Sequence, residues 1–193
     1  MKRFWMSVIA ALISTAALGV AAGPATAAPA TVTVEDPGNG GACGTVCWAH
    51  YVVFRGRPMM EWYAHVKATP NLSDRFDMDN NGCSAPGWTE FTTAGWSEIF
   101  HRACVIHDFG YRNFGPGEIH VNRAYLTFGQ PDWDADTDKE WIDQRFKQMM
   151  MWICAERDQP GGPDAGHWDT CEKWANTYYS GVRWGGNDAW NNG

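Results

Sequence analysis

A histidine and an aspartate stand side by side in the stretch CVIHDFGYRN, residues 104–113. Histidine is the side chain best suited to general-base catalysis near neutral pH, so His107 is a candidate base. Asp108 offers the hard carboxylate oxygens that Ca²⁺ prefers. Together these two residue types could hold a calcium ion next to a base that activates water. Most His–Asp pairs on helices are surface or capping pairs, so chemistry here requires further residues.

A general base works with a partner that orients its second ring nitrogen, and that partner is commonly a carboxylate. Asp143 is the candidate, and it lies in DKEWIDQRFKQMMMWICAER, the clearest helical pattern in the chain. Eleven residues, close to three helical turns, separate Asp143 from Cys154, so the two side chains share one face of this helix. Helices joined by disulfides could therefore bring Asp143 to His107.

Apolar residues recur at spacings of three and four along several segments, as expected for helices that pack against a core. One predicted helix covers about residues 96–114 and carries His107, with Ser97 as the candidate cap for its start. Few segments alternate with the period of two that is typical of strands, so the predicted fold is mainly α. The other predicted helices run from Pro58 to before Pro70, over 118–128, over 138–157 and over 170–184.

The first 27 residues have the pattern of a secretory signal peptide. Lys2 and Arg3 precede an apolar run, and Ala25-Thr26-Ala27 forms a cleavage pattern of small residues. The alternative is an uncleaved membrane anchor. No later apolar run reaches the ~18 residues that are needed to cross a bilayer. We therefore expect a secreted protein.

All six cysteines follow the predicted signal peptide, at positions 43, 47, 83, 104, 154 and 171. An even number of cysteines in an exported chain indicates a disulfide framework, although the sequence alone leaves the pairing open. The net charge is −7 and becomes more negative when Lys2 and Arg3 leave with the signal peptide. Such an acidic protein is a poor candidate for binding nucleic acid.

A zinc site is an alternative interpretation of the N-terminal cysteines. Cys43, Cys47 and His50 lie close together in CGTVCWAH, and His65 follows. This spacing is loose for structural zinc, and export favours a disulfide over free thiolates.

The motif ACVIHDFGYRN resembles the active-site helix of secreted phospholipase A2, in the branch found in bacteria and fungi. Three further stretches resemble that family in the same order along the chain. RFDMDNNGCS is similar to the approach to the calcium loop, IDQRFKQMMMWIC to the second long helix and CEKWANTYY to the end of the domain. The resemblance covers about residues 74–185.

The resemblance implies a disulfide-stapled helical domain in which two long antiparallel helices carry a His/Asp dyad. His107 would activate water, and Asp143 would hold its imidazole. Ca²⁺ would be bound by Asp108, by the carbonyl of Gly82 and by the side chain of Asn81, and would stabilise the oxyanion. The implied disulfides are Cys83–Cys104 and Cys154–Cys171, which leaves Cys43 with Cys47.

The family usually has aspartate where this chain has Asn81. Asparagine offers a neutral oxygen, so the calcium site would lose one negative charge and bind calcium more weakly. This departure supports an alternative function, a catalytically weak or inactive binding protein on the same scaffold. The intact His107, Asp108 and Asp143 argue against it. A third possibility keeps the hydrolase but changes the substrate to another ester or a lysolipid.

The resemblance thus implies a secreted calcium-dependent phospholipase A2 that hydrolyses the sn-2 ester of glycerophospholipids to a fatty acid and a lysophospholipid. Its partner would be a phospholipid membrane or micelle surface, and we expect a monomer that binds no nucleic acid. Tryptophans favour membrane interfaces, and the candidates for such contact are Trp88, Trp96, Trp184 and Trp190. The predicted organisation is a signal peptide at 1–27, an arm and extension at 28–73 and a phospholipase A2-like catalytic domain at 74–193.

Overall fold

The computed structural model describes residues 44–57, 59–83, 94–121 and 137–191. Every described residue belongs to one compact unit, which falls within residues 33–193. Within the described ranges all regular structure is helical, which confirms the predicted mainly α fold. No helix in these ranges is long and apolar enough to cross a membrane. The predicted signal peptide lies outside the described residues.

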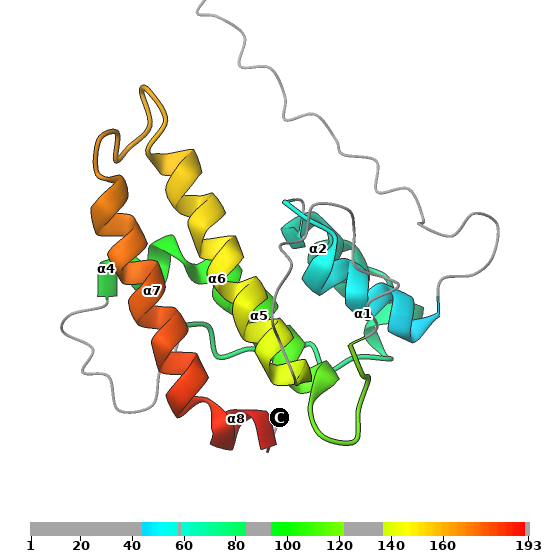
Figure 1. The fold of residues 1–193 in the computed structure, drawn as a ribbon. Helices are drawn as coiled ribbons and strands as arrows, with labels where there is room; N and C mark the ends of the chain where they lie inside the picture. Colours follow the sequence, from blue (N-terminus) through cyan, green and yellow to red (C-terminus); the bar gives the residue numbers. More distant parts are fainter. Residues whose placement is uncertain (1–43, 58, 84–93, 122–136, 192–193) are drawn as a thin grey trace, which may run out of the picture. The chain divides into compact units, whose positions relative to one another are not determined.

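The two longest helices, α6 and α7, lie side by side, and α5 packs against α6 (Figure 1). Helices α1 and α2 pack against each other and against α5. In chain order the described helices are α1 Thr45–Phe54, α2 Met59–Ala68, α3 Pro70–Ser73, α4 Ala94–Ile99, α5 His101–Phe114, α6 Asp138–Arg157, α7 Trp168–Gly185 and α8 Asn187–Asn191.

The N-terminus of α6 is capped by Thr137. Its hydroxyl accepts a hydrogen bond from the backbone N–H of Glu140 at 3.2 Å. The carboxylates of Asp138 and Glu140 lie in the first turn, where the positive end of the helix dipole attracts their negative charge and stabilises the helix. The helix predicted over 138–157 is therefore confirmed together with the reason for its starting point.

Helices α6 and α7 run antiparallel. Cys154 near the end of α6 is disulfide-bonded to Cys171 near the start of α7. Toward the opposite ends of the two helices, the guanidinium of Arg183 forms an ion pair with Glu140. A covalent bond at one end and an ion pair at the other thus fix the register between the two helices.

Helix α5 also runs antiparallel to α6. Arg102 at the start of α5 pairs with Glu156 near the end of α6. Tyr111 near the end of α5 contacts Asp143, which lies toward the start of α6. This arrangement confirms the predicted pair of antiparallel helices, and it places residues of α5 and α6 opposite one another along the length of α5.

The described part of the predicted N-terminal extension shares the core with these helices. Phe54 of α1 contacts Phe114, and Tyr63 of α2 meets Phe109 edge-on with ring centroids 6.0 Å apart. The division at residue 74 therefore remains a prediction about function and does not separate two cores.

A buried arginine joins α6 to α1. Arg145 is fully buried, and its Nε donates a hydrogen bond to the carbonyl of Val53 at 2.8 Å. That carbonyl lies in the last turn of α1, where a helix leaves its carbonyls without internal partners. The Arg145 guanidinium also lies over the ring of Trp152, 4.5 Å from the centroid.

The helix predicted over 96–114 is divided into α4 and α5 at Phe100. The ring of Phe100 is fully buried against Tyr178, and its backbone leaves the helical region at φ −91° and ψ 3°. The prediction of Ser97 as an N-cap was wrong, because Ser97 lies inside α4. Its hydroxyl is instead hydrogen-bonded to the hydroxyl of Tyr178 at 2.7 Å.

Two other predicted helix positions fall partly outside the described residues. Residues 118–121 of the helix predicted over 118–128 are described, and they are not helical. The remaining residues of that segment lie outside the description. Pro58 also lies outside it, while α2 begins at the next residue and ends before Pro70 as predicted.

Helices α5 and α6 approach closely at Gly110, which generates a prediction about stability. A Cβ on Gly110 would lie 2.7 Å from Cγ2 of the buried Ile142. We expect Gly110→Ala to lower the free energy of unfolding by about 1–3 kcal/mol, the usual cost of overpacking. Gly95→Ala in α4 is the matched control, because a Cβ there meets nothing within 4 Å. Denaturant unfolding measures both variants, and equal stabilities would contradict the close approach.

Candidate active site

The structure brings the two predicted dyad residues into direct contact. Nε2 of His107 on α5 lies 3.0 Å from Oδ1 of Asp143 on α6. Asp143 is fully buried, and His107 is 5% exposed. A carboxylate at this distance fixes the tautomer and the orientation of the imidazole, so the proton on Nε2 points at Asp143 and Nδ1 is left as the acceptor.

Within the described part of the chain, Nδ1 of His107 has no hydrogen-bond partner. The ring itself is held between Tyr111 and Phe146, with centroid distances of 4.1 Å and 4.5 Å. The imidazole is therefore fixed in place by aromatic packing, and its acceptor nitrogen is not used by any described residue.

Asp143 receives three further donors. The Tyr111 hydroxyl donates to Oδ1 at 2.7 Å, and Lys139 Nζ donates to Oδ2 at 2.8 Å. Arg183 on α7 approaches Oδ2 at 3.4 Å through Nη1. With His107, the donors come from α5, α6 and α7, so the position of this carboxylate depends on the packing of all three helices.

These contacts decide the charge state of the dyad. Burial alone would raise the pKa of Asp143, but the hydrogen bond and charge of His107 and the ammonium of Lys139 outweigh it, so the pKa is held below its usual range. Burial and the neighbouring Asp143 raise the pKa of Tyr111, which keeps its hydroxyl protonated as a donor. The dyad thus contains an ionised carboxylate at neutral pH.

The loop before Cys83 lies against Asp108. The backbone N–H of Asn81 donates to Oδ2 of Asp108 at 3.0 Å. Gly82 has a φ of +66°, a left-handed conformation that glycine adopts without strain. The Cys83–Cys104 disulfide then ties the loop to α5. All three residues predicted to bind calcium are thereby brought together.

A second contact holds the start of the same loop. The backbone N–H of Asp77 donates to the side-chain oxygen of Asn113 at 3.0 Å, and the Asn113 amide donates back to the Asp77 carbonyl at 2.9 Å. The Arg112 guanidinium lies 3.3 Å from the Asp77 carboxylate. The residues that close the motif CVIHDFGYRN therefore position the loop opposite its histidine and aspartate.

The donor set at Asp108 fits a hard cation. Burial raises the pKa of Asp108, and this effect outweighs the lowering by His107 and by the backbone N–H groups of Asn81 and Gly82. Keeping this carboxylate ionised is therefore costly, and a bound cation would offset that cost. Among the described residues, no group of three or more His, Cys, Asp and Glu side chains could hold a metal. Within the described ranges, the further ligands would be carbonyl, amide or water oxygens, which suits Ca²⁺.

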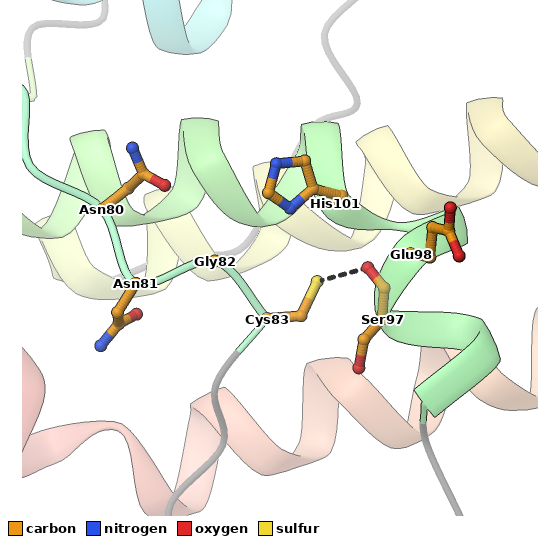
Figure 2. A pocket seen from close by; sticks show the side chains of 7 residues that line it. All are labelled: Asn80, Asn81, Gly82, Cys83, Ser97, Glu98 and His101. Atoms are coloured by element: carbon orange, nitrogen blue, oxygen red, sulfur yellow. Dashed lines mark hydrogen bonds between the residues drawn. The ribbon is translucent and has the colours of Figure 1, made fainter. Parts of the chain in front are cut away.

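A hollow of about 560 Å³ adjoins this loop (Figure 2). Its walls come from the loop on one side and from α4 and the start of α5 on the other. Neither His107 nor Asp143 lines the hollow, so the hollow does not enclose the dyad. The lining residues are Asn80, Asn81, Gly82, Cys83, Ser97, Glu98 and His101.

The described cysteines contradict the zinc hypothesis. Cys47 is disulfide-bonded, so it offers no thiolate to a metal. Nδ1 of His50 lies 2.7 Å from the carbonyl of Val46, and its ring is buried. The predicted partner of Cys47, Cys43, lies outside the described residues. The other two disulfides implied by the resemblance, Cys83–Cys104 and Cys154–Cys171, are confirmed.

The sequence was compared with models of known protein families. The model of the prokaryotic phospholipase A2 family matches residues 49–186, well over half of the chain. The chain belongs to the prokaryotic phospholipase A2 family. Membership implies a phospholipase A2 hydrolase, and it confirms the resemblance carried by the sequence motifs. No curated protein shows significant similarity to the chain.

The match to the prokaryotic phospholipase A2 family begins within α1, ahead of the stretch on which the sequence resemblance rested. The dyad, the loop at Asn81 and both described disulfides fall inside it. Phospholipases A2 generally depend on calcium, and the Asp108 carboxylate offers a hard oxygen ligand of the type that this metal prefers.

Sequence reasoning missed three residues that contact Asp143. Tyr111 lies four residues after His107, and Lys139 lies four residues before Asp143. A spacing of four places two side chains on the same helix face, so both contacts had a local signal. Arg183 had none, because it reaches Asp143 across the α6–α7 interface from 40 residues away.

Loss of the Tyr111 hydroxyl would remove one of the hydrogen bonds that position the Asp143 carboxylate. We expect Tyr111→Phe to reduce kcat about tenfold, because a hydrogen bond to a charged acceptor contributes roughly 1.5–3 kcal/mol. KM should change little, since the hydroxyl lies behind the dyad. Tyr178→Phe is the matched control, because it removes a buried tyrosine hydroxyl that faces Ser97 instead. Equal kcat values for the two variants would contradict a role for Tyr111 at the dyad.

The lowered pKa of Asp143 generates a prediction about pH and stability. A carboxyl whose pKa is lower in the folded state stabilises the fold at pH values above its unfolded pKa of about 3.9, and this contribution is lost as the pH falls through the folded value. The difference in unfolding free energy between the wild type and Asp143→Asn should therefore be constant near neutral pH and shrink below about pH 4. Denaturant unfolding at pH 7, 5 and 3 measures it, and a difference that does not change with pH would contradict the assignment.

Proposed function

We propose that the protein is a secreted, calcium-dependent phospholipase A2 that hydrolyses the sn-2 ester of glycerophospholipids. The products are a fatty acid and a lysophospholipid. The observation that carries this proposal is the buried pair of His107 and Asp143, with Nε2 held at 3.0 Å from the carboxylate and Nδ1 unpartnered among the described residues. In this arrangement Nδ1 of His107 takes a proton from water as the water oxygen attacks the ester carbonyl.

Each residue around the dyad has a separate task in this mechanism. Asp143 stabilises the imidazolium that forms on His107, and it stays ionised throughout. Tyr111 and Lys139 hold the two carboxylate oxygens in place. The proton that His107 has accepted then passes to the departing alcohol oxygen of the lysophospholipid, which returns the imidazole to its neutral form.

The proposed calcium ligands are Asp108, the carbonyl of Gly82 and the side chain of Asn81. Bound calcium would polarise the ester carbonyl and stabilise the oxyanion. Asp108 and His107 are adjacent on α5, so the metal and the base would face neighbouring atoms of one ester. Asn81 supplies no charge, so the only carboxylate among the three proposed ligands is that of Asp108.

The proposed partner is the surface of a phospholipid membrane or micelle, on which the enzyme acts as a monomer. Trp184 supports this proposal, because its side chain is 83% exposed near the end of α7. Of the other tryptophans suggested for such contact, Trp96 and Trp190 are partly buried against the core. Trp88 lies outside the described residues.

The decisive test measures fatty acid release from mixed micelles of phosphatidylcholine with two different acyl chains. The wild type is assayed with calcium and with a chelator, beside His107→Gln and His120→Gln. We expect calcium-dependent release of the sn-2 chain, and a loss of about 10²–10⁴-fold in His107→Gln because the general base is removed. His120 is a matched control because its side chain is 84% exposed and lies outside the site.

Each other outcome overturns a different part of the proposal. Folded protein that releases no fatty acid at millimolar calcium would favour the inactive binding protein. Release that persists in the chelator would remove calcium from the mechanism. Full activity in His107→Gln would remove the dyad, and release of the sn-1 chain would change the reaction.

The neutral ligand Asn81 generates a further prediction. Calcium affinity rests partly on the number of charged ligands. We therefore expect Asn81→Asp to lower the calcium concentration for half-maximal activity several-fold, with little change in activity at saturating calcium. Asp79→Asn is the control, because it alters the charge of the same loop at a residue outside the proposed ligand set. A calcium titration of hydrolysis measures both, and an unchanged requirement in Asn81→Asp would contradict its role as a ligand.

A further inference from the structure

The hollow beside the loop continues directly from the proposed calcium site. Asn81 and Gly82 belong to both, since they line the hollow and lie against Asp108. Figure 2 shows the loop running from Asn80 to Cys83 along α5, with His101 at the far side of the hollow. A ligand anchored at the metal site would therefore have space next to it along this face of α5.

Helix geometry supports this continuity. His101 and Asp108 are seven residues apart on α5, close to two full turns, so their side chains project from nearly the same face about 10 Å apart. Cys104 lies between them and is bonded to Cys83 of the loop. A Cβ on Gly82 would lie 3.5 Å from Nδ1 of His101, so the loop and the start of α5 are in near contact here.

The charge of the hollow is acidic. Its residues include no lysine and no arginine, and the carboxylate belongs to Glu98 at the end of α4. Glu98 forms no ion pair with any described residue, while the nearby Arg102 is already paired with Glu156. An exposed carboxylate that has no ion-pair partner among the described residues, in a hollow whose lining contains no lysine or arginine, is suited to a cationic ligand.

We propose that this hollow binds the ammonium group of a phospholipid headgroup, with Glu98 as its counter-charge. The inference rests on the function proposed above, because the phosphate of the same lipid would face the metal site. It assigns the substrate class: zwitterionic phospholipids, whose headgroup ends in a choline or ethanolamine, are hydrolysed in preference to anionic phosphatidylglycerol. The ester bond reacts at His107, and the headgroup is held beside the loop.

The size of the effect follows from the position of Glu98. Its side chain is exposed, so its attraction for an ammonium group is screened by water and salt. Exposed ion pairs contribute little, which corresponds to a roughly threefold to fivefold preference. The preference should weaken as the ionic strength rises.

The experiment compares kcat/KM for phosphatidylcholine and for phosphatidylglycerol, each as a guest in the same neutral mixed micelle. We expect the wild type to favour phosphatidylcholine, and we expect Glu98→Gln to lower the ratio by about threefold to fivefold. Glu61→Gln on α2 is the matched control, because it removes the same charge from an exposed glutamate outside the hollow. An unchanged ratio in Glu98→Gln, or an equal change in both variants, would overturn the proposal.

A binding measurement separates this inference from the proposed function. Phosphocholine is titrated into the wild type and into Glu98→Gln in the presence of calcium, and binding is followed by NMR. Weaker binding to the variant than to the wild type supports the headgroup site, and equal binding or none overturns it. A wild type that hydrolyses no phospholipid would reject the proposed function, and the titration would still decide whether the hollow recognises the headgroup.

Discussion

The arrangement of the helices depends on one buried carboxylate. An ionised aspartate without contact to water is costly unless several donors surround it. Asp143 meets this requirement with the imidazole of His107, the hydroxyl of Tyr111, the ammonium of Lys139 and the guanidinium of Arg183. Since these donors belong to α5, α6 and α7, a shift of any one helix leaves a buried charge less well satisfied. The contacts that stabilise the packing of these helices are therefore the same contacts that orient the base.

Much of this site could be predicted from sequence, because its signals are local. His107 and Asp108 are adjacent, and the cysteines that flank the site fall at positions where the family motifs imply their pairing. Tyr111 and Lys139 carry a weaker signal, since a spacing of four only places them on the right helix face. Arg183 could not be found, because its contact with Asp143 depends on the register between α6 and α7, which no local pattern encodes.

Tertiary packing also explains the errors in the predicted elements. The periodicity around Ser97 is continuous, so it favours one helix, yet the buried ring of Phe100 and the hydroxyl contact with Tyr178 divide the segment. Likewise, CGTVCWAH supplies the residue types of a zinc site, but His50 is buried and Cys47 is oxidised. In both cases the local pattern was compatible with two outcomes, and contacts between distant residues selected one of them.

The Cys83–Cys104 disulfide has a consequence for when the enzyme becomes competent. It closes a segment of 21 residues and is the covalent link between the loop at Gly82 and helix α5. In a reducing compartment this link is absent, and the loop must be held to Asp108 by hydrogen bonds alone. Closure of such a segment by a disulfide stabilises the folded state by roughly 3 kcal/mol in the chain-entropy description. If the chain is exported as proposed, oxidation completes the link between this loop and α5 only after the chain has left the reducing compartment where it is made.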